Sequence, residues 1–284
     1  MSRARLAAGG YEAVFLPELG MLGASVRYLG MELLSLPGGL AAYRGGHATG
    51  LPLLAPWANR LSRRRFRVGR VAIDLRRMAL PVDDNGLPIH GTMLGPHRWE
   101  VVRLEPARLV ARYAYEHRAF PLPHELEIDV RVSEQGLQVV TLLRPTGRRR
   151  VPVSFGWHPY FRAERSARLR TPPCRHLVLD AGGIPTGESE QQLAQELRVA
   201  DHALDDLYAL GRNRTFVLHR TKLDVEIRFG TGYPYAQLYA PPGKRFVAVE
   251  PMTAATDALV TGAAPLVGPG DRFRAVFAVS AVLP

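Results

Sequence analysis

Polar and apolar residues alternate with a period of two along much of this chain. The clearest stretch, residues 125–132, reads ELEIDVRV and alternates without a break. Turn-forming residues follow at 133–136, and apolar positions resume over 137–143. Alternation of this kind places one face of a strand in a core and the other in water, so the segment predicts a β-hairpin.

The same pattern predicts strands at residues 66–75, 97–104, 109–116, 215–220, 224–229, 235–240, 246–250 and 273–282. Helical patterns are few, and the best is a two-turn helix over residues 190–198. The 27 glycines and 23 prolines interrupt the chain at short intervals, as a fold of many antiparallel strands requires. We therefore predict an all-β protein, a large antiparallel β-sandwich with few short helices, forming a single domain over residues 1–284.

Composition fits a folded protein with an ordinary core, since hydrophobic residues make up 46% of the chain. The formal net charge is +11, but lysine occurs only at Lys222 and Lys244, so the excess comes from scattered arginines. No sequence signature of a nucleic-acid-binding fold accompanies this charge, and we expect no nucleic-acid partner.

Cysteine usage and hydropathy bear on the cellular compartment. Cys174 is the single cysteine, so an internal disulfide is excluded. The first fifteen residues lack the long apolar segment of a signal peptide, and no stretch reaches the roughly 18 apolar residues of a transmembrane helix. We expect a cytoplasmic protein with no membrane partner, either a monomer or a homodimer.

Two loop segments carry polar groups suited to a ligand. Residues 50–60, GLPLLAPWANR, end in Asn59 and Arg60, and the arginine fork can donate to hydroxyls or carboxylates. A surface ion pair would explain Arg60 equally well. In GLPIHG, residues 86–91, His90 lies between bend-forming residues where backbone can approach a ligand; a merely exposed histidine is the simpler alternative.

A third segment, residues 151–161, reads VPVSFGWHPYF and divides by parity. Val153, Phe155 and Trp157 point into a core, whereas His158 shares the opposite face with Ser154 and Gly156. Small residues beside a histidine leave room for a ligand. This favours a functional His158 over a histidine that is only packed in the core.

Glu250 ends the apolar strand of residues 246–250 and is followed by a proline. By parity it shares a face with Phe246 and Ala248, opposite Val247 and Val249. A carboxylate at such a position is costly unless it is paired or used, and partial burial would raise its pKa toward that of a general base.

Two further strands add polar groups. Gln237 lies between Tyr235 and Tyr239 on one face, and amides beside aromatic rings suit sugar hydroxyls and C–H faces. Asp205 and Asp206 precede an apolar turn. Each pattern also has an ordinary explanation, as an amphipathic strand and as a turn or cap respectively.

Taken together, these segments resemble the aldose 1-epimerase, or galactose mutarotase, family. The sequence carries GLPLLAPWANRL, IHG, FGWHPYF, LDAGGIPTGE, LDDLYAL, AQLYAPPG and VEPMTAATDAL in the family's order, from about Tyr11 to the C-terminus. The resemblance implies an antiparallel β-supersandwich with an open sugar-binding groove.

The resemblance also implies roles for individual residues. His158 matches the family's general acid and Glu250 its general base. Sugar-binding positions correspond to Asn59, Arg60, His90, Asp205 and Gln237, with Asp206 an alternative to Asp205. The implied reaction interconverts the α and β anomers of a free aldose by opening and closing its ring, and it needs no metal and no cofactor.

Three other functions remain open. A hexose-6-phosphate 1-epimerase would use some of the arginines to bind phosphate. A non-catalytic carbohydrate-binding or regulatory module on the same fold would not need both His158 and Glu250. A glycoside hydrolase would need two carboxylates flanking the bond, and only Asp205 or Asp206 could accompany Glu250.

Overall fold

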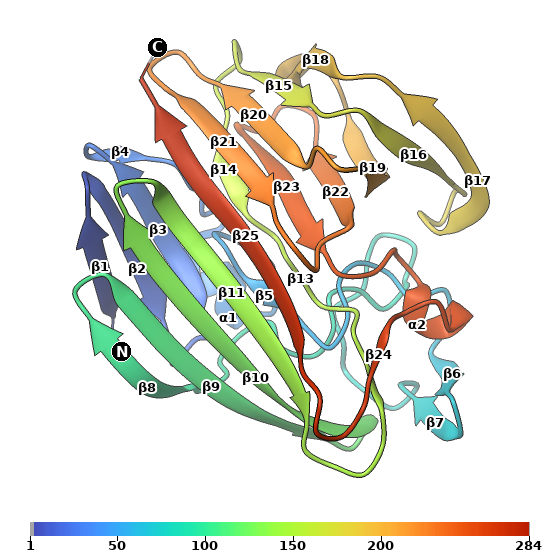
Figure 1. Cartoon of the computed structure of the whole chain (residues 1–284). Helices are drawn as coiled ribbons and strands as arrows, with labels where there is room; N and C mark the ends of the chain where they lie inside the picture. Colours follow the sequence, from blue (N-terminus) through green and yellow to red (C-terminus); the bar gives the residue numbers. More distant parts are fainter. Residues whose placement is uncertain (1–2, 284) are drawn as a thin grey trace.

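The computed structural model describes residues 3–283, which are folded mainly into antiparallel strands (Figure 1). Two large sheets form the body of the molecule. The first has nine strands in the order β18 (Gln195–Arg198), β15 (Arg168–Thr171), β20 (Thr215–His219), β21 (Asp224–Phe229), β25 (Phe273–Val282), β11 (Gly136–Pro145), β10 (Phe120–Ser133), β9 (Arg108–His117) and β8 (Glu100–Glu105).

The second large sheet runs β17 (Pro185–Gln192), β16 (Cys174–Leu179), β19 (Leu204–Leu210), β22 (Tyr235–Ala240), β23 (Phe246–Met252), β13 (Gly156–Trp157) and β5 (Leu53–Leu54), and β14 (Tyr160–Arg162) also pairs with β23. Smaller sheets comprise β1 (Ala4–Ala8), β2 (Tyr11–Leu16), β3 (Leu22–Tyr28) and β4 (Met31–Glu32); β6 (Arg65–Val68) and β7 (Val71–Asp74); and β12 (Val151–Pro152) with β24 (Leu266–Val267). The helices are α1 (Gly39–Arg44), α2 (Ala258–Thr261) and the 3-10 turn η1 (Val199–Asp201).

The all-β prediction is confirmed, and several predicted strands agree with the structure to the residue. Strands β21, β22 and β25 occupy the predicted ranges 224–229, 235–240 and 273–282. The predicted hairpin is β10–β11, paired in register from Glu125 opposite Arg144 to Ser133 opposite Gly136. The predicted strand over residues 66–75 is instead the short hairpin β6–β7, which turns at Gly69 and Arg70.

The two large sheets pack face to face through aromatic side chains. The ring of Trp157 on β13 lies 5.9 Å from that of Phe277 on β25, and Phe155 lies 6.1 Å from Phe273. The indole Nε1 of Trp157 also donates a hydrogen bond of 3.0 Å to Thr141 on β11. One face of the second sheet is therefore fixed in the core, which leaves its other face for the site described below.

The N-terminal sheet is joined to the C-terminal strand. Tyr11 on β2 accepts a hydrogen bond from the backbone N–H of Ala281 on β25 and donates one to the Ala281 carbonyl, at 2.8 Å and 3.0 Å. Figure 1 shows strands β1–β4 beside the long strands β9 and β10.

The predicted helix over residues 190–198 is wrong. Residues up to Gln192 belong to β17, which pairs with β16, and Gln195–Arg198 form β18, which pairs with β15. The chain thus crosses from one large sheet to the other within two residues. The glutamate- and glutamine-rich composition favours a helix only weakly, and pairing with neighbouring strands overrides that preference.

None of the helices within residues 3–283 has the length and apolar character needed to cross a membrane.

Candidate active site

The outer face of the second large sheet carries three of the predicted site residues on adjacent strands. Glu250 on β23 lies directly opposite Gln237 on β22. Gln237 in turn is paired with Leu207 on β19. Asp205 lies two residues before Leu207 on that strand, so the side chains of Asp205 and Gln237 lie on the same face of the sheet. The predicted parity of Glu250 is confirmed, because Val247 and Val249 on the opposite face belong to the hydrophobic core.

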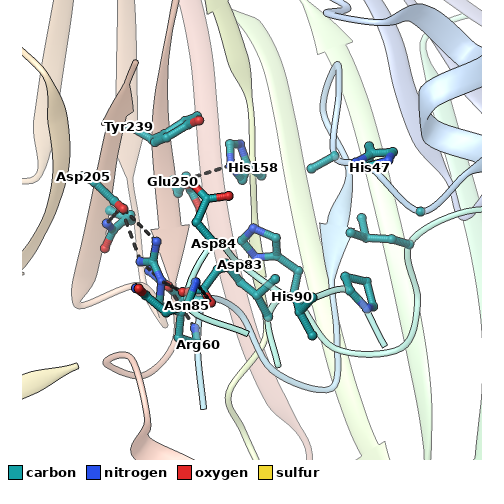
Figure 2. A pocket seen from close by; sticks show the side chains of 18 of the residues that line it. His47, Arg60, Asp83, Asp84, Asn85, His90, His158, Asp205, Tyr239 and Glu250 are labelled. Atoms are coloured by element: carbon teal, nitrogen blue, oxygen red, sulfur yellow. Dashed lines mark hydrogen bonds and ion pairs between the residues drawn. The ribbon is translucent and has the colours of Figure 1, made fainter. Parts of the chain in front are cut away.

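A cavity of about 440 Å³ opens on this face (Figure 2). The structure brings all seven predicted residues to its wall: Asn59, Arg60, His90, His158, Asp205, Gln237 and Glu250. They come from six separate stretches of the sequence, and only the fold places them together.

His158 and Glu250 form a buried pair at the cavity wall. The Nε2 atom of His158 lies 3.1 Å from Oε1 of Glu250, and the two side chains are only 4% and 2% exposed. The ring of Tyr160 stacks on His158 at 4.2 Å, and His90 contacts it edge-on at 5.4 Å. These rings exclude water from the imidazole while leaving the pair open to the cavity.

Burial shifts both pKa values toward the neutral forms. It raises the pKa of Glu250 well above its ordinary value, with a further contribution from Asp205, and it lowers the pKa of His158 well below its ordinary value, with a further contribution from His90. Both shifts favour a pair of two neutral groups over an ion pair of imidazolium and carboxylate. These two forms differ only in the position of one proton, which suits a site that both gives and takes protons.

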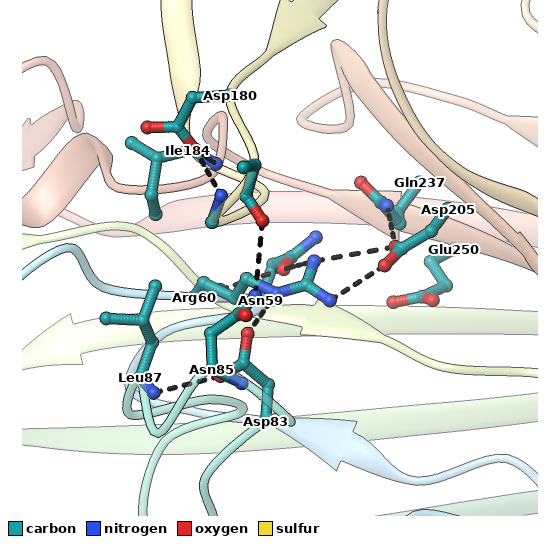
Figure 3. A network of polar contacts seen from close by, with 12 residues as sticks. Asn59, Arg60, Asp83, Asn85, Leu87, Asp180, Ile184, Asp205, Gln237 and Glu250 are labelled. Carbon is teal, nitrogen blue, oxygen red and sulfur yellow. Dashed lines mark hydrogen bonds and ion pairs between the residues drawn. The ribbon is translucent and has the colours of Figure 1, made fainter.

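Arg60 is held by two carboxylates (Figure 3). Its Nε donates to Asp83 at 2.6 Å, and its NH2 group donates to Asp205 at 2.7 Å. The Gln237 amide donates to Asp205 at 2.6 Å, so Arg60, Asp205 and Gln237 form one connected network. Asp206 contacts His176 at 3.0 Å, so of the two aspartates it is Asp205 that faces the cavity.

Asn59 and His90 lie on two neighbouring loops whose backbones are joined. The N–H of His90 donates to the Asn59 carbonyl at 3.0 Å, and that of Thr92 donates to the Ala55 carbonyl at 2.9 Å. Both Asn59 and His90 have left-handed φ angles, 58° and 62°. Strained backbone of this kind persists where the surroundings fix it, and here it directs both side chains to the cavity.

The residue after His90 must be a glycine, Gly91, because the two loops pass very close to each other there. Its φ is +73°, and a Cβ there would lie 2.1 Å from the carbonyl oxygen of Ala55. Only glycine permits the two loops to come this close.

Burial lowers the pKa of the adjacent His90 to about 3, so its imidazole is neutral near pH 7 and is available as a hydrogen-bond donor or acceptor.

The prediction that small residues beside His158 leave room for a ligand is wrong. We expected Ser154 and Gly156 to leave room for a ligand, but neither lines the cavity. A Cβ on Gly156 would lie 2.8 Å from the Pro251 carbonyl oxygen and 2.9 Å from Ala58. The small residue therefore serves close packing between strands and the loop before Arg60.

Several cavity residues were not predicted from the sequence. The turn Asp83-Asp84-Asn85 forms part of the wall, as does His47. Asp83 accepts backbone hydrogen bonds from Asn85 and Leu87 with its Oδ1, and its Oδ2 accepts from Arg60. The sequence DDNG predicts the turn, but not that the turn's aspartate would also hold an arginine 23 positions earlier.

Four buried polar atoms around the cavity have no protein partner: Nδ1 of His90, Nδ1 of His158, Oε1 of Gln237 and Oε2 of Glu250. Unpaired buried atoms occur elsewhere in the core, but here they gather on one cavity wall. Leaving such groups unsatisfied is costly, so their arrangement indicates a polar ligand. Within residues 3–283, no group of three or more His, Cys, Asp or Glu side chains is placed to hold a metal ion.

The sequence model of the family described as aldose 1-epimerase matches residues 26–277. No curated protein sequence matches the chain significantly.

Solved structures share its fold at low sequence identity. A galactose mutarotase-like protein from Clostridium acetobutylicum is 20% identical, with a TM-score of 0.86 over 99% of this chain and 95% of that chain. A putative aldose 1-epimerase from Escherichia coli K12 is 18% identical, with a TM-score of 0.82 over 100% and 99%. An aldose epimerase homologue from C. elegans is 16% identical, with a TM-score of 0.83 over 99% of each chain. These likenesses show the fold, and the family match covers most of the sequence: the chain belongs to the aldose 1-epimerase family.

Proposed function

We propose that this protein is an aldose 1-epimerase that interconverts the α and β anomers of a free aldohexose by acid–base catalysis. The observation that carries the proposal is the buried His158–Glu250 pair, 3.1 Å apart, in the wall of a cavity lined with unpaired polar atoms. Family membership supports a carbohydrate epimerase in general.

In the proposed mechanism, the reactive form of the pair is imidazolium and carboxylate, and it arises when Glu250 transfers its proton to His158 across their 3.1 Å contact. Glu250 accepts the proton of the C1 hydroxyl while His158 donates one to the ring oxygen O5, and the C1–O5 bond opens to the aldehyde. Both residues are then neutral. Rotation about the C1–C2 bond presents the other face of the carbonyl, and the ring closes as the two protons return. Because only protons move, the reaction requires no cofactor.

The remaining cavity residues would position the sugar. Arg60 and Asp205 hold each other, and together with Gln237 they present an ordered set of donors and acceptors to hydroxyl groups. Asn59 accepts from the backbone N–H of Arg60 at 2.8 Å, so it fixes the loop as well as lining the cavity. Such fixed positioning contributes to rate beyond the proton transfers themselves.

Polarimetry tests the proposal directly. Freshly dissolved α-glucose and α-galactose are followed with and without the protein at constant pH. We expect the approach to anomeric equilibrium to accelerate in proportion to protein concentration. A rate equal to that of buffer alone for both sugars would contradict the proposed activity and would leave a non-catalytic sugar-binding module as the better interpretation.

The dependence of rate on pH follows from the two shifted pKa values. Since burial lowers the pKa of His158 below 6.5 and raises that of Glu250 above 4.5, the zero-charge pair gains a proton only at low pH and loses one only at high pH. We expect kcat/KM to show no titration at the ordinary pKa of histidine, because the pair keeps zero net charge through that pH. A fall in activity as the pH rises through about 6.5, the ordinary histidine value, would contradict the burial argument.

The alternative substrate, a hexose 6-phosphate, is disfavoured by the charges of the cavity wall. Asp83, Asp84 and Asp205 line it, and the single arginine among the lining residues, Arg60, already binds two of these carboxylates. We expect glucose to be turned over at least as efficiently as glucose 6-phosphate, with little effect of salt. Comparison of kcat/KM for both sugars at low and high salt checks this, and a phosphate preference that collapses with salt would favour the alternative.

A further inference from the structure

The cavity has two chemically different ends, and the catalytic pair lies between them. At one end Arg60, Asp205 and Gln237 form the hydrogen-bonded network. Glu250 lies beside Gln237, and His158 lies beyond Glu250, next to His90. Figure 2 shows this order continuing to His47 at the other end.

A second cavity of about 570 Å³ adjoins the His47 end. The two cavities share the lining residues Gly46, His47, Pro81, Val82 and Leu94. None of the residues of the catalytic pair or of the Arg60 network lines the second cavity. His47 and Val82 are exposed at this rim, so a flexible ligand can pass over it from one cavity to the other.

The proposed roles of the pair fix the direction of a bound pyranose. In the ring, C1 is bonded to C2 on one side and to O5 on the other, and O5 is bonded to C5, which carries C6. With the C1 hydroxyl at Glu250 and O5 at His158, C2 points toward Asp205 and Gln237. The C5–C6 edge consequently points toward His47 and the second cavity.

From this geometry we propose that the second cavity is a subsite for a glycosyl group attached at O6, so that the enzyme accepts 1→6-linked reducing disaccharides. The inference rests on the proposed epimerase function. A 1→6 linkage has one more rotatable bond than linkages to ring hydroxyls, which allows the second ring to cross the rim at His47.

The second cavity has a mixed lining, in which apolar side chains lie beside the basic side chains of Arg44, His47 and His117. Met78, Leu80, Val82 and Leu94 give it an apolar surface for the C–H face of a pyranose. Arg44 is in the last turn of α1, where its charge meets the carbonyl end of the helix. The backbone N–H groups of Gly45, Gly46 and His47 donate within that helix end, to Ala41, Tyr43 and Ala42, rather than into the cavity.

Two isomeric disaccharides provide the test. In isomaltose a glucosyl group is attached at O6 of the reducing glucose, and in kojibiose the same group is attached at O2, the position directed toward Arg60, Asp205 and Gln237. Anomer exchange of glucose, isomaltose and kojibiose is measured by NMR magnetisation transfer between the anomeric protons. We expect kcat/KM for isomaltose to be close to that for glucose, and that for kojibiose to be lower by about tenfold or more.

A substitution in the second cavity tests whether the O6-linked glucosyl ring of isomaltose binds there. Ala79 is exposed and lines only the second cavity, so Ala79→Trp fills that cavity without disturbing the core. We expect it to lower the ratio of kcat/KM for isomaltose to that for glucose by about tenfold. Ala72→Trp is the matched control, because Ala72 is an exposed alanine on β7 that lines neither cavity, and it should leave this ratio unchanged.

Failure of the inference is distinguishable from failure of the proposed function. If glucose is epimerised but Ala79→Trp does not change the ratio, or kojibiose is turned over as well as isomaltose, the subsite is wrong and the function stands. If glucose 6-phosphate surpasses isomaltose and loses that advantage in high salt, the second cavity binds phosphate instead. If no aldose is turned over, the function itself fails.

Discussion

Replacing Glu250 by glutamine is expected to lower kcat/KM for mutarotation by about 100-fold or more, because an amide keeps the size of the side chain but cannot accept the C1 hydroxyl proton. His158→Asn should have an effect of similar size, since asparagine cannot deliver a proton to O5. Initial rates by polarimetry on α-glucose measure both effects. In the double variant Glu250→Gln/His158→Asn, the two losses of transition-state stabilisation should not add, because in the proposed mechanism the residues act as one proton-transfer unit.

Folding of the variants separates a chemical loss from a structural one. Glu250 is buried, and its charged form is disfavoured there, so a neutral amide at this position should leave the melting temperature unchanged or slightly raised. A folded Glu250→Gln protein with nearly normal turnover would remove Glu250 from the mechanism.

A second histidine–carboxylate pair serves as the matched control for His158. The Nε2 atom of His176 lies 3.0 Å from Asp206, nearly the same as the 3.1 Å between His158 and Glu250. Both side chains are about 30% exposed and neither lines the active-site cavity. His176→Asn should therefore leave mutarotation unchanged, which would show that a His–carboxylate contact on this sheet is not sufficient by itself.

Features with a local sequence pattern could be predicted from the sequence alone. Strands such as Asp224–Phe229 and Phe273–Val282 alternate because one face is buried, so their ends agree with the prediction. The same parity argument placed Val249 in the core and Glu250 on the other face. The proposal that His158 and Glu250 are the acid and the base needed more than parity, since it depended on the family resemblance of the motifs around them.

Features that depend on contacts distant in sequence could not be predicted in this way. Asp83 is part of an ordinary turn in the sequence, and its ion pair with Arg60 exists only because the fold brings the two loops together. Residues 190–198 favour a helix locally, yet strand pairing decides their structure. Gly156 permits close packing with Pro251, whereas the sequence alone indicated space for a ligand.

The second large effect is expected for Arg60→Met, which should impair both stability and catalysis. The Arg60 and Asp83 side chains are only 13% and 6% exposed, so removing the guanidinium leaves a largely buried carboxylate without its charged partner. Breaking a buried pair typically costs about 3–5 kcal/mol of unfolding free energy, and we expect a loss near the lower end because Asp83 keeps two backbone hydrogen bonds. Chemical denaturation monitored by fluorescence measures this loss.

The control is an ion pair of the same length on the surface. Arg76 donates to Asp74 at 2.6 Å, the same distance as between Arg60 and Asp83, but its side chain is 60% exposed. Arg76→Met should change neither stability nor turnover measurably, because solvent screens such a pair. If Arg60→Met proved equally silent, burial of the Arg60 network would have no energetic role.

The catalytic part of the Arg60→Met effect follows from the connection of Arg60 to Asp205. Without the guanidinium, Asp205 keeps the hydrogen bond from the Gln237 amide but loses its charged partner, and a bound sugar would lose both a donor and an ordered acceptor at the C2 end of the cavity. We expect kcat/KM to fall by about tenfold or more, measured well below the melting temperature. The pH profile should keep its shape, because the proton-transfer pair is intact. A changed profile with an unaltered KM would instead mean that Arg60 acts by tuning Glu250 rather than by binding the sugar.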